Sequence, residues 1–351
     1  METSSKTLGS SRLEYIDLAR GICMIAIVLG HLDEFAINRF VFTFHLPVFF
    51  IISGYFFDPS IDLVSLIKKR FRTLIIPYLT ACLLVIISSV AINFFVWHAD
   101  AVTIINKTIL LLKASAFGVG SNWPYPFNMP GIGALWFLWA LFWGVIILRM
   151  LLYIPELPRA LIVCALVFFA SFTAEYSVFL PLSIQPGCIA VMYIYVGYLW
   201  KKYKDDIASL AAGLKALLAA AAIIYWTVFI ISFRSFWLVN CECGKGIPDF
   251  IGSICASFLI IALSNLVTKH AYKLTSVIRC AGRYSIIVLT AHIIELNTFP
   301  WNLPVALILG DNASHISSLI LTIVLKFIWI FLFTFVVSRI RPARKLFGLK
   351  S

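Results

Sequence analysis

The sequence has few charged residues. Asp, Glu, Lys and Arg make up only 13% of its 351 residues, whereas 62% are hydrophobic. A soluble protein needs more polar surface than this composition supplies, so we predict an integral membrane protein. Since a helix needs roughly 20 apolar residues to cross a bilayer, the length allows about ten crossings with short connections. This excludes a separate soluble catalytic domain.

The apolar segments also lack the alternation of polar and apolar residues that an outer-membrane barrel requires. They are continuous and rich in Leu, Ile, Ala and Phe. We therefore expect an all-α polytopic membrane bundle that forms one domain over residues 1–351. The expected spans are about 15–36, 40–57, 74–96, 133–153, 160–176, 185–200, 214–233, 248–267, 283–299 and 315–338.

Acidic residues are scarce: 16 Asp and Glu stand against 28 Lys and Arg, a net charge of +12. The basic residues concentrate on alternate loops, as in the clusters 68–72 and 339–345. The opposite loops hold only Arg39, Lys107, Lys113, Arg234 and Lys245. This asymmetry predicts a plasma (inner) membrane protein with a polar N-terminus (1–14) and a basic tail (339–351), both cytoplasmic. Anionic lipid then accounts for the charge, and no nucleic-acid partner is expected.

The chain lacks the two cysteine pairs of a typical zinc site. Most of its eight cysteines lie in apolar segments, but Cys241 and Cys243 flank Glu242 in the loop "NCECGKG". A single C-x-C pair indicates zinc poorly, so no metal is expected and the role of the two thiols stays open.

Residues 97–132 form the longest outer connection. It contains "GVGSNWPYPFNMPGIG", whose Gly, Pro and Asn residues disfavour a regular helix, and we expect an irregular lid or wall over the bundle. Within it, Trp123 is a candidate for stacking on a sugar ring, although interfacial anchoring is the more common role of such a residue.

The first span carries Asp17, Arg20 and His31. At about 100° per residue, eleven steps return to within about 20°, so Arg20 and His31 share a helix face about 16 Å apart. Asp17, one turn before Arg20, is placed to pair with it. Arg20 is expected near the cytoplasmic surface and His31 near the outer one. Taken singly, each fits a simpler role, as a snorkelling arginine or an interfacial histidine.

A second histidine, His45, is expected at a depth similar to that of His31. Asp33 and Glu34 lie in the connection between the two. Such a group is suited to general-base chemistry on a hydroxyl, with a carboxylate fixing the imidazole tautomer. Later in the chain, His292 and Glu295 lie one turn apart, and Lys326 is expected at a similar depth. Two roles stay open for Glu295, a buried ion pair with Lys326 or the lining of an acceptor site.

Five segments occur in an order that resembles the acyltransferase-3 family of membrane O-acyltransferases, with the fucose 4-O-acetylase-like branch as the nearest. They span nearly the whole chain, and ten helices with cytoplasmic ends are the architecture of that family. The segments are Arg20-x10-His31, "FHLPVFFIISGYFF", "KKRFRTLIIPY", "ALWFLWALF" and "GRYSIIVLTAHIIE".

The resemblance implies transfer of an acyl group to a hydroxyl of a carbohydrate or glycolipid at the membrane. The usual donor is cytoplasmic acetyl-CoA. It also implies that His31 is catalytic, that Arg20 is essential, and that Arg70 and Arg72 form the basic entry to the third helix.

These residues suggest a mechanism, which is a hypothesis here. Arg20, Arg70 and Arg72 would hold the phosphates of acyl-CoA, and its extended arm would follow the helix face to His31. His31 would then act as a general base or pass through an acyl-histidine, two alternatives that stay open. Further candidates for contact with substrate are Trp123, Trp136, His292 and Glu295.

Two other functions are considered. One is a proton-coupled small-molecule transporter that uses His31, His45, Glu295 and Lys326, although the lack of an internal repeat disfavours inverted halves. The other is a non-catalytic partner in an envelope-assembly complex, for which no residue pattern speaks directly.

Overall fold

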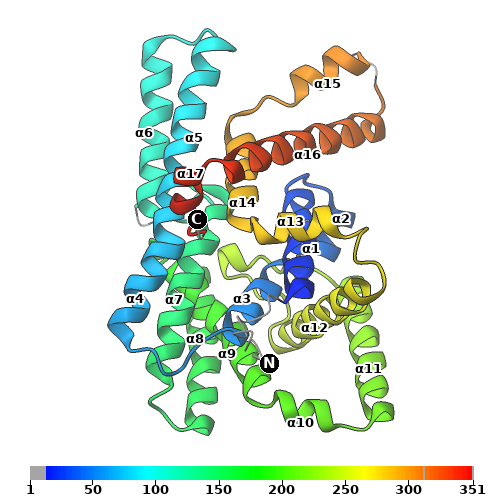
Figure 1. Cartoon of the computed structure of the whole chain (residues 1–351). Helices are drawn as coiled ribbons and strands as arrows, with labels where there is room; N and C mark the ends of the chain where they lie inside the picture. The colour runs from blue at the N-terminus through cyan, green and yellow to red at the C-terminus, as the bar shows by residue number, and fades with distance from the viewer. Residues whose placement is uncertain (1–12, 126, 177, 311–312, 350–351) are drawn as a thin grey trace, which may run out of the picture.

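The computed structural model describes residues 13–125, 127–176, 178–310 and 313–349 (Figure 1). This part of the chain is helical, with a single antiparallel bridge between Trp123 and Met129. The predicted all-α bundle is therefore confirmed. Of the expected cytoplasmic ends, residues 1–12 and 350–351 lie outside the described residues.

Each expected span coincides with a helix or a pair of helices. These are α1 (Glu14–Gly30), α2 (Phe35–Val41) with α3 (His45–Tyr55), α5 (Ile76–Phe95), α7 (Trp136–Leu151), α8 (Glu156–Tyr176), α9 (Ile184–Lys202), α11 (Ala212–Ile231), α12 (Ile247–His270), α13 (Ser276–Arg283) with α14 (Ser285–Thr298), and α16 (His315–Arg339). The remaining helices are α4 (Leu63–Arg70), α6 (Ala101–Phe117), α10 (Lys204–Ser209), α15 (Asn302–Leu309) and α17 (Arg341–Leu346), with a π-helical turn at Phe71–Ile75 and 3-10 turns at Gly133–Leu135 and Leu238–Asn240.

The number of spans differs from the expected ten. In the described chain, seven helices are long and apolar enough to cross a membrane, or up to eight if α13 and α14, which meet at 84°, form one broken span. α1, with 17 residues, and α9, with 19, are not among these candidates. By length and composition the described chain therefore supports seven or eight of the ten expected spans, and the remaining expected segments form helices as well.

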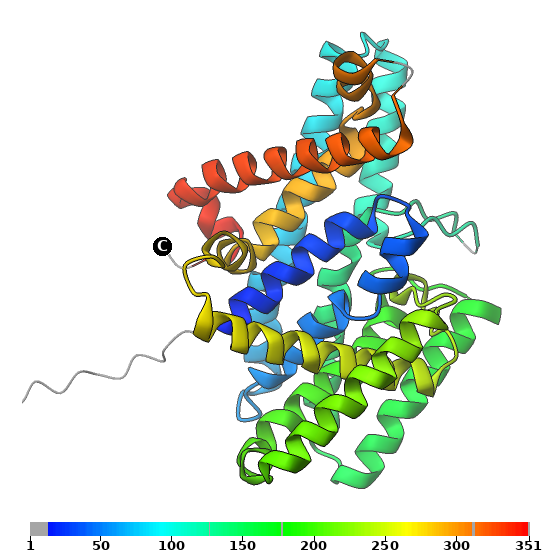
Figure 2. The same ribbon diagram turned by 90° about the vertical axis from the view of Figure 1, so that its right-hand side faces the viewer.

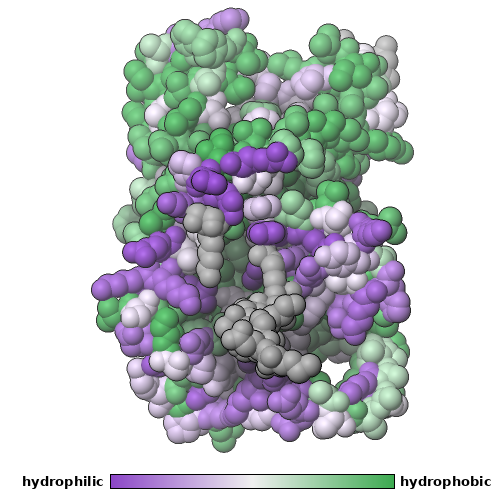
Figure 3. All heavy atoms as spheres, viewed as in Figure 1, coloured by the Kyte–Doolittle hydropathy of each residue, from purple (hydrophilic) through white to green (hydrophobic). Residues whose placement is uncertain are grey.

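α1 crosses the molecule from the face that carries α17 to the face that carries α2 and the 118–132 connection (Figure 2). The two ends of the described chain therefore lie on one face. Hydrophilic residues gather across this face, whereas the upper part of the molecule is largely hydrophobic (Figure 3). Its assignment to the cytoplasm remains a prediction from the distribution of basic residues.

The 97–132 connection is only partly irregular, contrary to expectation. Residues Ala101–Phe117 form α6, which runs beside α5 (Figure 1). The Asp100 side chain caps its first turn by accepting a hydrogen bond from the Thr103 N–H, and Gly118 ends it with a left-handed φ of 61°. The Gly, Pro and Asn residues that led to the prediction all follow α6, which ends at Phe117.

α3, which carries His45, crosses α9 at two facing glycines. A Cβ atom at Gly54 would lie 1.9 Å from the carbonyl oxygen of Ile194, and one at Gly197 would lie 1.9 Å from that of Ile51. Glycine is thus needed at both positions for the backbones to touch, a common way of packing helices in membranes.

α1 crosses α13 in the same manner. A Cβ atom at Gly21 would lie 1.9 Å from the carbonyl oxygen of Ile278, and one at Gly282 would lie 1.8 Å from that of Asp17. This contact fixes the half of α1 that contains Arg20.

We expect Gly197→Ala to destabilise the protein by about 1–3 kcal/mol, because the added methyl group forces α3 and α9 apart. Thermal unfolding of the detergent-purified protein measures the effect as a lower Tm. The matched control is Gly213→Ala in α11, where a Cβ atom would meet nothing within 4 Å. Equal Tm values for the two variants would contradict the close crossing.

Candidate active site

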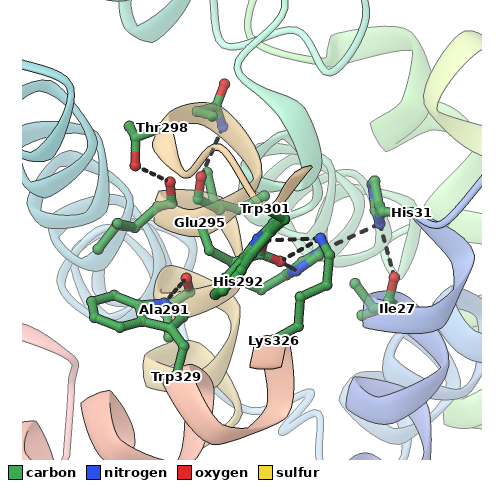
Figure 4. Close-up of polar contacts among 12 residues, drawn as sticks. Ile27, His31, Ala291, His292, Glu295, Thr298, Trp301, Lys326 and Trp329 are labelled. Atoms are coloured by element: carbon green, nitrogen blue, oxygen red, sulfur yellow. Dashed lines mark hydrogen bonds and ion pairs between the residues drawn. The ribbon is translucent and has the colours of Figure 1, made fainter. Parts of the chain in front are cut away.

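His31 directly follows the last residue of α1 and faces α14. Its Nδ1 lies 2.8 Å from the carbonyl oxygen of Ile27 and 3.2 Å from Nε2 of His292 (Figure 4). The two imidazole rings meet edge to face, with centroids 4.9 Å apart. His31 therefore contacts the late "GRYSIIVLTAHIIE" segment through His292.

The buried carboxylate of Glu295 contacts His292 at the ring nitrogen that does not face His31. Nδ1 of His292 lies 2.8 Å from Oε1 of Glu295, one turn along α14. Nζ of Lys326, on α16, donates to both oxygens of Glu295 at 3.0 and 2.9 Å, and the Trp301 indole N–H donates to Oε2 (Figure 4). The side chains of His292 and Glu295 are fully buried. The Glu295–Lys326 ion pair left open by the sequence is thus present.

The contacts determine how protons are placed in the neutral histidines. A carboxylate only accepts hydrogen bonds, so His292 donates from Nδ1 and carries a lone pair on Nε2. His31 therefore donates its Nδ1–H, shared between Ile27 and His292. The remaining ring nitrogen of His31, Nε2, is left with a lone pair. This is the protonation pattern of a general base held in one tautomer by a histidine and a carboxylate.

His31 lines a cavity of about 300 Å³. Asp33, His45 and Trp136 line it as well, and residues 236–239 of the α11–α12 connection close it. The cavity therefore brings together two of the expected catalytic histidines, one of the two expected carboxylates and one expected substrate-contacting tryptophan.

Arg20 and Arg70 line a second cavity, of about 230 Å³. Ile27, Phe137 and Leu289 belong to the linings of both cavities, so the two adjoin across a wall of these side chains. The cavities lie at the two halves of α1, and His31 and Arg20 each face the interior of the bundle.

Two of the expected donor-site residues lie apart from this second cavity. Arg72 is exposed and is not among its lining residues, because residues two apart on a helix point to different sides. Asp17 is buried in α1 where it crosses α13, outside the same lining.

The carboxylate that orients His31 is not one of the two expected from the sequence. Glu34 accepts a hydrogen bond from Nε2 of His315 at 2.7 Å, away from the cavity. His45 donates from Nδ1 to the carbonyl oxygen of Val41 at 2.7 Å, and no carboxylate of the described residues forms a hydrogen bond with it. Asp33 lines the cavity, but the carboxylate that orients the His31 ring is that of Glu295, which acts through His292.

Three of the four residues expected to contact substrate do not line the His31 cavity. His292 and Glu295 lie behind His31 and outside the lining of its cavity. Trp123 stacks on Phe179, with ring centroids 4.2 Å apart, and faces another cavity.

The sequence prediction missed Asn38. This residue of α2 lines the His31 cavity, is only 7% exposed, and its Oδ1 has no hydrogen-bond partner within the described chain. A buried amide without a partner costs free energy, so its retention beside His31 points to a ligand. Its position in the apolar run "FAINRFVF" was the available signal.

Comparison with known proteins shows the family of the chain. No curated protein matches the chain, but the model of a family described as an acyltransferase domain matches residues 13–339. The matched residues include α1 with His31, the two cavities and the Glu295–Lys326 pair. The fucose 4-O-acetylase-like branch stays a prediction. With nearly its whole length matched, the chain belongs to the acyltransferase-3 family of membrane acyltransferases and is a transferase acting on acyl groups.

Proposed function

We propose that this protein transfers an acetyl group from cytoplasmic acetyl-CoA to a hydroxyl of a carbohydrate or glycolipid at the plasma (inner) membrane. The observation that carries the proposal is the His31 imidazole. It lines a cavity, its Nδ1–H is engaged by Ile27 and His292, and Nε2 is left as the base.

The reaction follows from this arrangement. Nε2 of His31 takes the proton of the acceptor hydroxyl while the hydroxyl oxygen attacks the thioester carbon. The resulting imidazolium shares its Nδ1–H with His292, and the Glu295 carboxylate stabilises the positive charge through that ring. Collapse of the tetrahedral intermediate breaks the C–S bond, and the proton on His31 passes to the CoA thiolate. In the alternative route, Nε2 of His31 attacks the thioester carbon, and the C–S bond breaks with release of the CoA thiolate. The acceptor hydroxyl then attacks the acyl-histidine, gives its proton to the thiolate and releases the neutral imidazole.

Arg20 and Arg70 are suited to hold the phosphates of the donor. Guanidinium groups bind phosphate oxygens bidentately, and the two share one cavity on the side of the molecule that we assign to the cytoplasm. The donor arm then has to pass between Ile27, Phe137 and Leu289 to reach His31. These are apolar side chains, which can rotate aside without breaking hydrogen bonds.

We expect Arg20→Ala and Arg70→Ala each to raise the KM for acetyl-CoA by about tenfold or more, since each removes charge-assisted hydrogen bonds to phosphate. The matched control is Arg72→Ala, because Arg72 is exposed outside the cavity. Steady-state kinetics with varied donor checks this. An equal KM increase for Arg72→Ala would show a general charge effect rather than a donor site.

Asn38 is placed to accept a hydrogen bond from the acceptor hydroxyl at its unpartnered Oδ1. We expect Asn38→Ala to lower kcat/KM for the acceptor by about two- to tenfold, the usual effect of losing one hydrogen bond. Asn106→Ala, at an exposed position of α6, is the control and should retain wild-type kcat/KM. A wild-type kcat/KM for Asn38→Ala, measured on protein of unchanged Tm, would exclude this role.

The function as a whole is tested with purified protein and acetyl-CoA. We expect release of free CoA thiol, and mass spectrometry of envelope glycans should show one additional acyl unit only when the protein is present. If the protein were a transporter, labelled solute would undergo counterflow in proteoliposomes without any acyl-CoA. If it were a non-catalytic partner, loss of His31 would leave the glycans unchanged.

A further inference from the structure

The largest of the described cavities, about 1020 Å³, lies between α8, α12 and the α11–α12 connection, and we call it the outer groove. One part of its lining is charged and comprises Glu175, Arg234 and Glu242. The other part is apolar and includes Phe168 and Ile251, which are 71% and 44% exposed on α8 and α12. Both helices are candidate membrane spans, so the apolar part opens toward lipid.

The outer groove adjoins the His31 cavity along two separate chain segments. In the α11–α12 connection, residues 236–239 line the His31 cavity, while residues 234–235 and 240–244 line the outer groove. In the α6–α7 connection, Gly120 and Ser121 line the former and Trp123 the latter. The same two segments therefore contribute to the linings of both spaces.

The charged part of the outer groove has the chemistry of a saccharide site. Trp123 has one ring face against Phe179, and its buried indole N–H has no hydrogen-bond partner among the described residues. The Glu242 carboxylate is fixed by hydrogen bonds from Ser235 and Asn240. An aromatic ring, an N–H donor and a fixed carboxylate together suit a ring that carries both C–H and O–H groups.

We propose that the outer groove binds a lipid-linked saccharide as the acceptor. Its hydrocarbon chain lies against Phe168 and Ile251, its saccharide lies beside Trp123, Arg234 and Glu242, and a hydroxyl reaches His31 past residues 236–239. This inference rests on the proposed acyl transfer and adds the lipid-linked nature of the acceptor. A water-soluble saccharide would not need the apolar part of the groove, and a phospholipid would not need the carboxylates.

Binding is tested by photolabelling of the full-length protein in nanodiscs. Two diazirine probes with the same alkyl chain are compared, one with a disaccharide headgroup and one with a phosphoethanolamine headgroup. We expect the disaccharide probe to label peptides of α8 and α12 preferentially. Trp123→Ala and Arg234→Ala should each weaken its binding about two- to tenfold, whereas Tyr125→Ala, at an exposed position of the same loop as Trp123, should not. Equal labelling by both probes would show an ordinary lipid site and overturn the proposal.

A second arm measures acylation of envelope glycans in cells. Ile254→Trp should narrow the outer groove and reduce acylation about tenfold or more, because overpacking excludes the chain. Leu263→Trp, on the same helix at a lipid-exposed position, should retain it. If His31→Ala abolishes acylation while Ile254→Trp and Arg234→Ala leave it at the wild-type level, the groove assignment is wrong and the acyl transfer stands. If His31→Ala has no effect, the proposed function itself fails.

Discussion

Replacing His31 with alanine is expected to lower acyl transfer by about 10²–10⁴-fold, which is the usual contribution of a positioned general base. The reason is geometric: Nε2 of His31 is the nitrogen that the contacts with Ile27 and His292 leave unprotonated beside the cavity. A larger loss would be expected if the reaction passes through an acyl-histidine, because no covalent intermediate could then form.

The measurement is release of CoA thiol by purified protein at saturating donor. His270→Ala is the control, since His270 is exposed at the end of α12. The His31→Ala protein should show an unchanged Tm, because the His31 side chain lies at the edge of a cavity. Wild-type turnover by purified His31→Ala would refute the mechanism.

The second large effect is expected at Glu295. Glu295→Gln keeps the size of the side chain but removes the charge that stabilises a His31–His292 pair carrying an extra proton. Loss of the equivalent carboxylate in hydrolytic triads costs about 10⁴-fold in turnover, and we expect about 10²–10⁴-fold here. The same change leaves the Lys326 ammonium buried and unpaired, which should destabilise the protein by about 3–5 kcal/mol.

A double variant separates these two consequences. Glu295→Gln/Lys326→Met removes both charges of this pair, so the Tm should return most of the way to the wild-type value. Turnover should stay low, because the carboxylate is still missing. The pH dependence of turnover should also change relative to wild type, which loss of a purely structural contact would not cause. Recovery of both Tm and turnover in the double variant would mean that Glu295 and Lys326 only support the fold.

The sequence predicts the positions of the long apolar helices well because each is marked by an apolar run, whereas α6 and the short helices between the runs were not predicted. The spacing of Arg20 and His31 likewise follows from helix geometry alone, and both side chains do line cavities inside the bundle. A run of apolar residues does not show where the helix bends. The break between α13 and α14 and the π-helical turn before α5 are therefore seen only in the structure.

The partners of His31 were harder to predict than His31 itself. Asp33 and Glu34 are near in sequence and were the natural candidates, yet the orienting carboxylate comes from residue 295, on a helix that packs beside α1 only after folding. The sequence did mark His292, Glu295 and Lys326 as ionisable groups at membrane depth, which are costly unless paired. It could not show that their chain of contacts ends at His31.

For the donor site the spacing held more information than the prediction used. Arg70 and Arg72 are two residues apart, so a helix points them to different faces, and only Arg70 lines the cavity with Arg20. Asn38 was missed because a single amide in an apolar helix has no spacing to set it apart; burial and an unpartnered oxygen identify it.

The most direct test of the account is a sided acyl-transfer measurement. The protein is reconstituted in one orientation in proteoliposomes, with labelled acetyl-CoA on the face of Arg20 and Arg70 and a glycolipid extract of the source envelope exposed on the face of His31. We predict label in the glycolipid, release of CoA on the donor face, and loss of both in His31→Ala. Transfer only when donor and acceptor share the His31 face would contradict a donor that enters beside Arg20 and reaches His31 through the bundle.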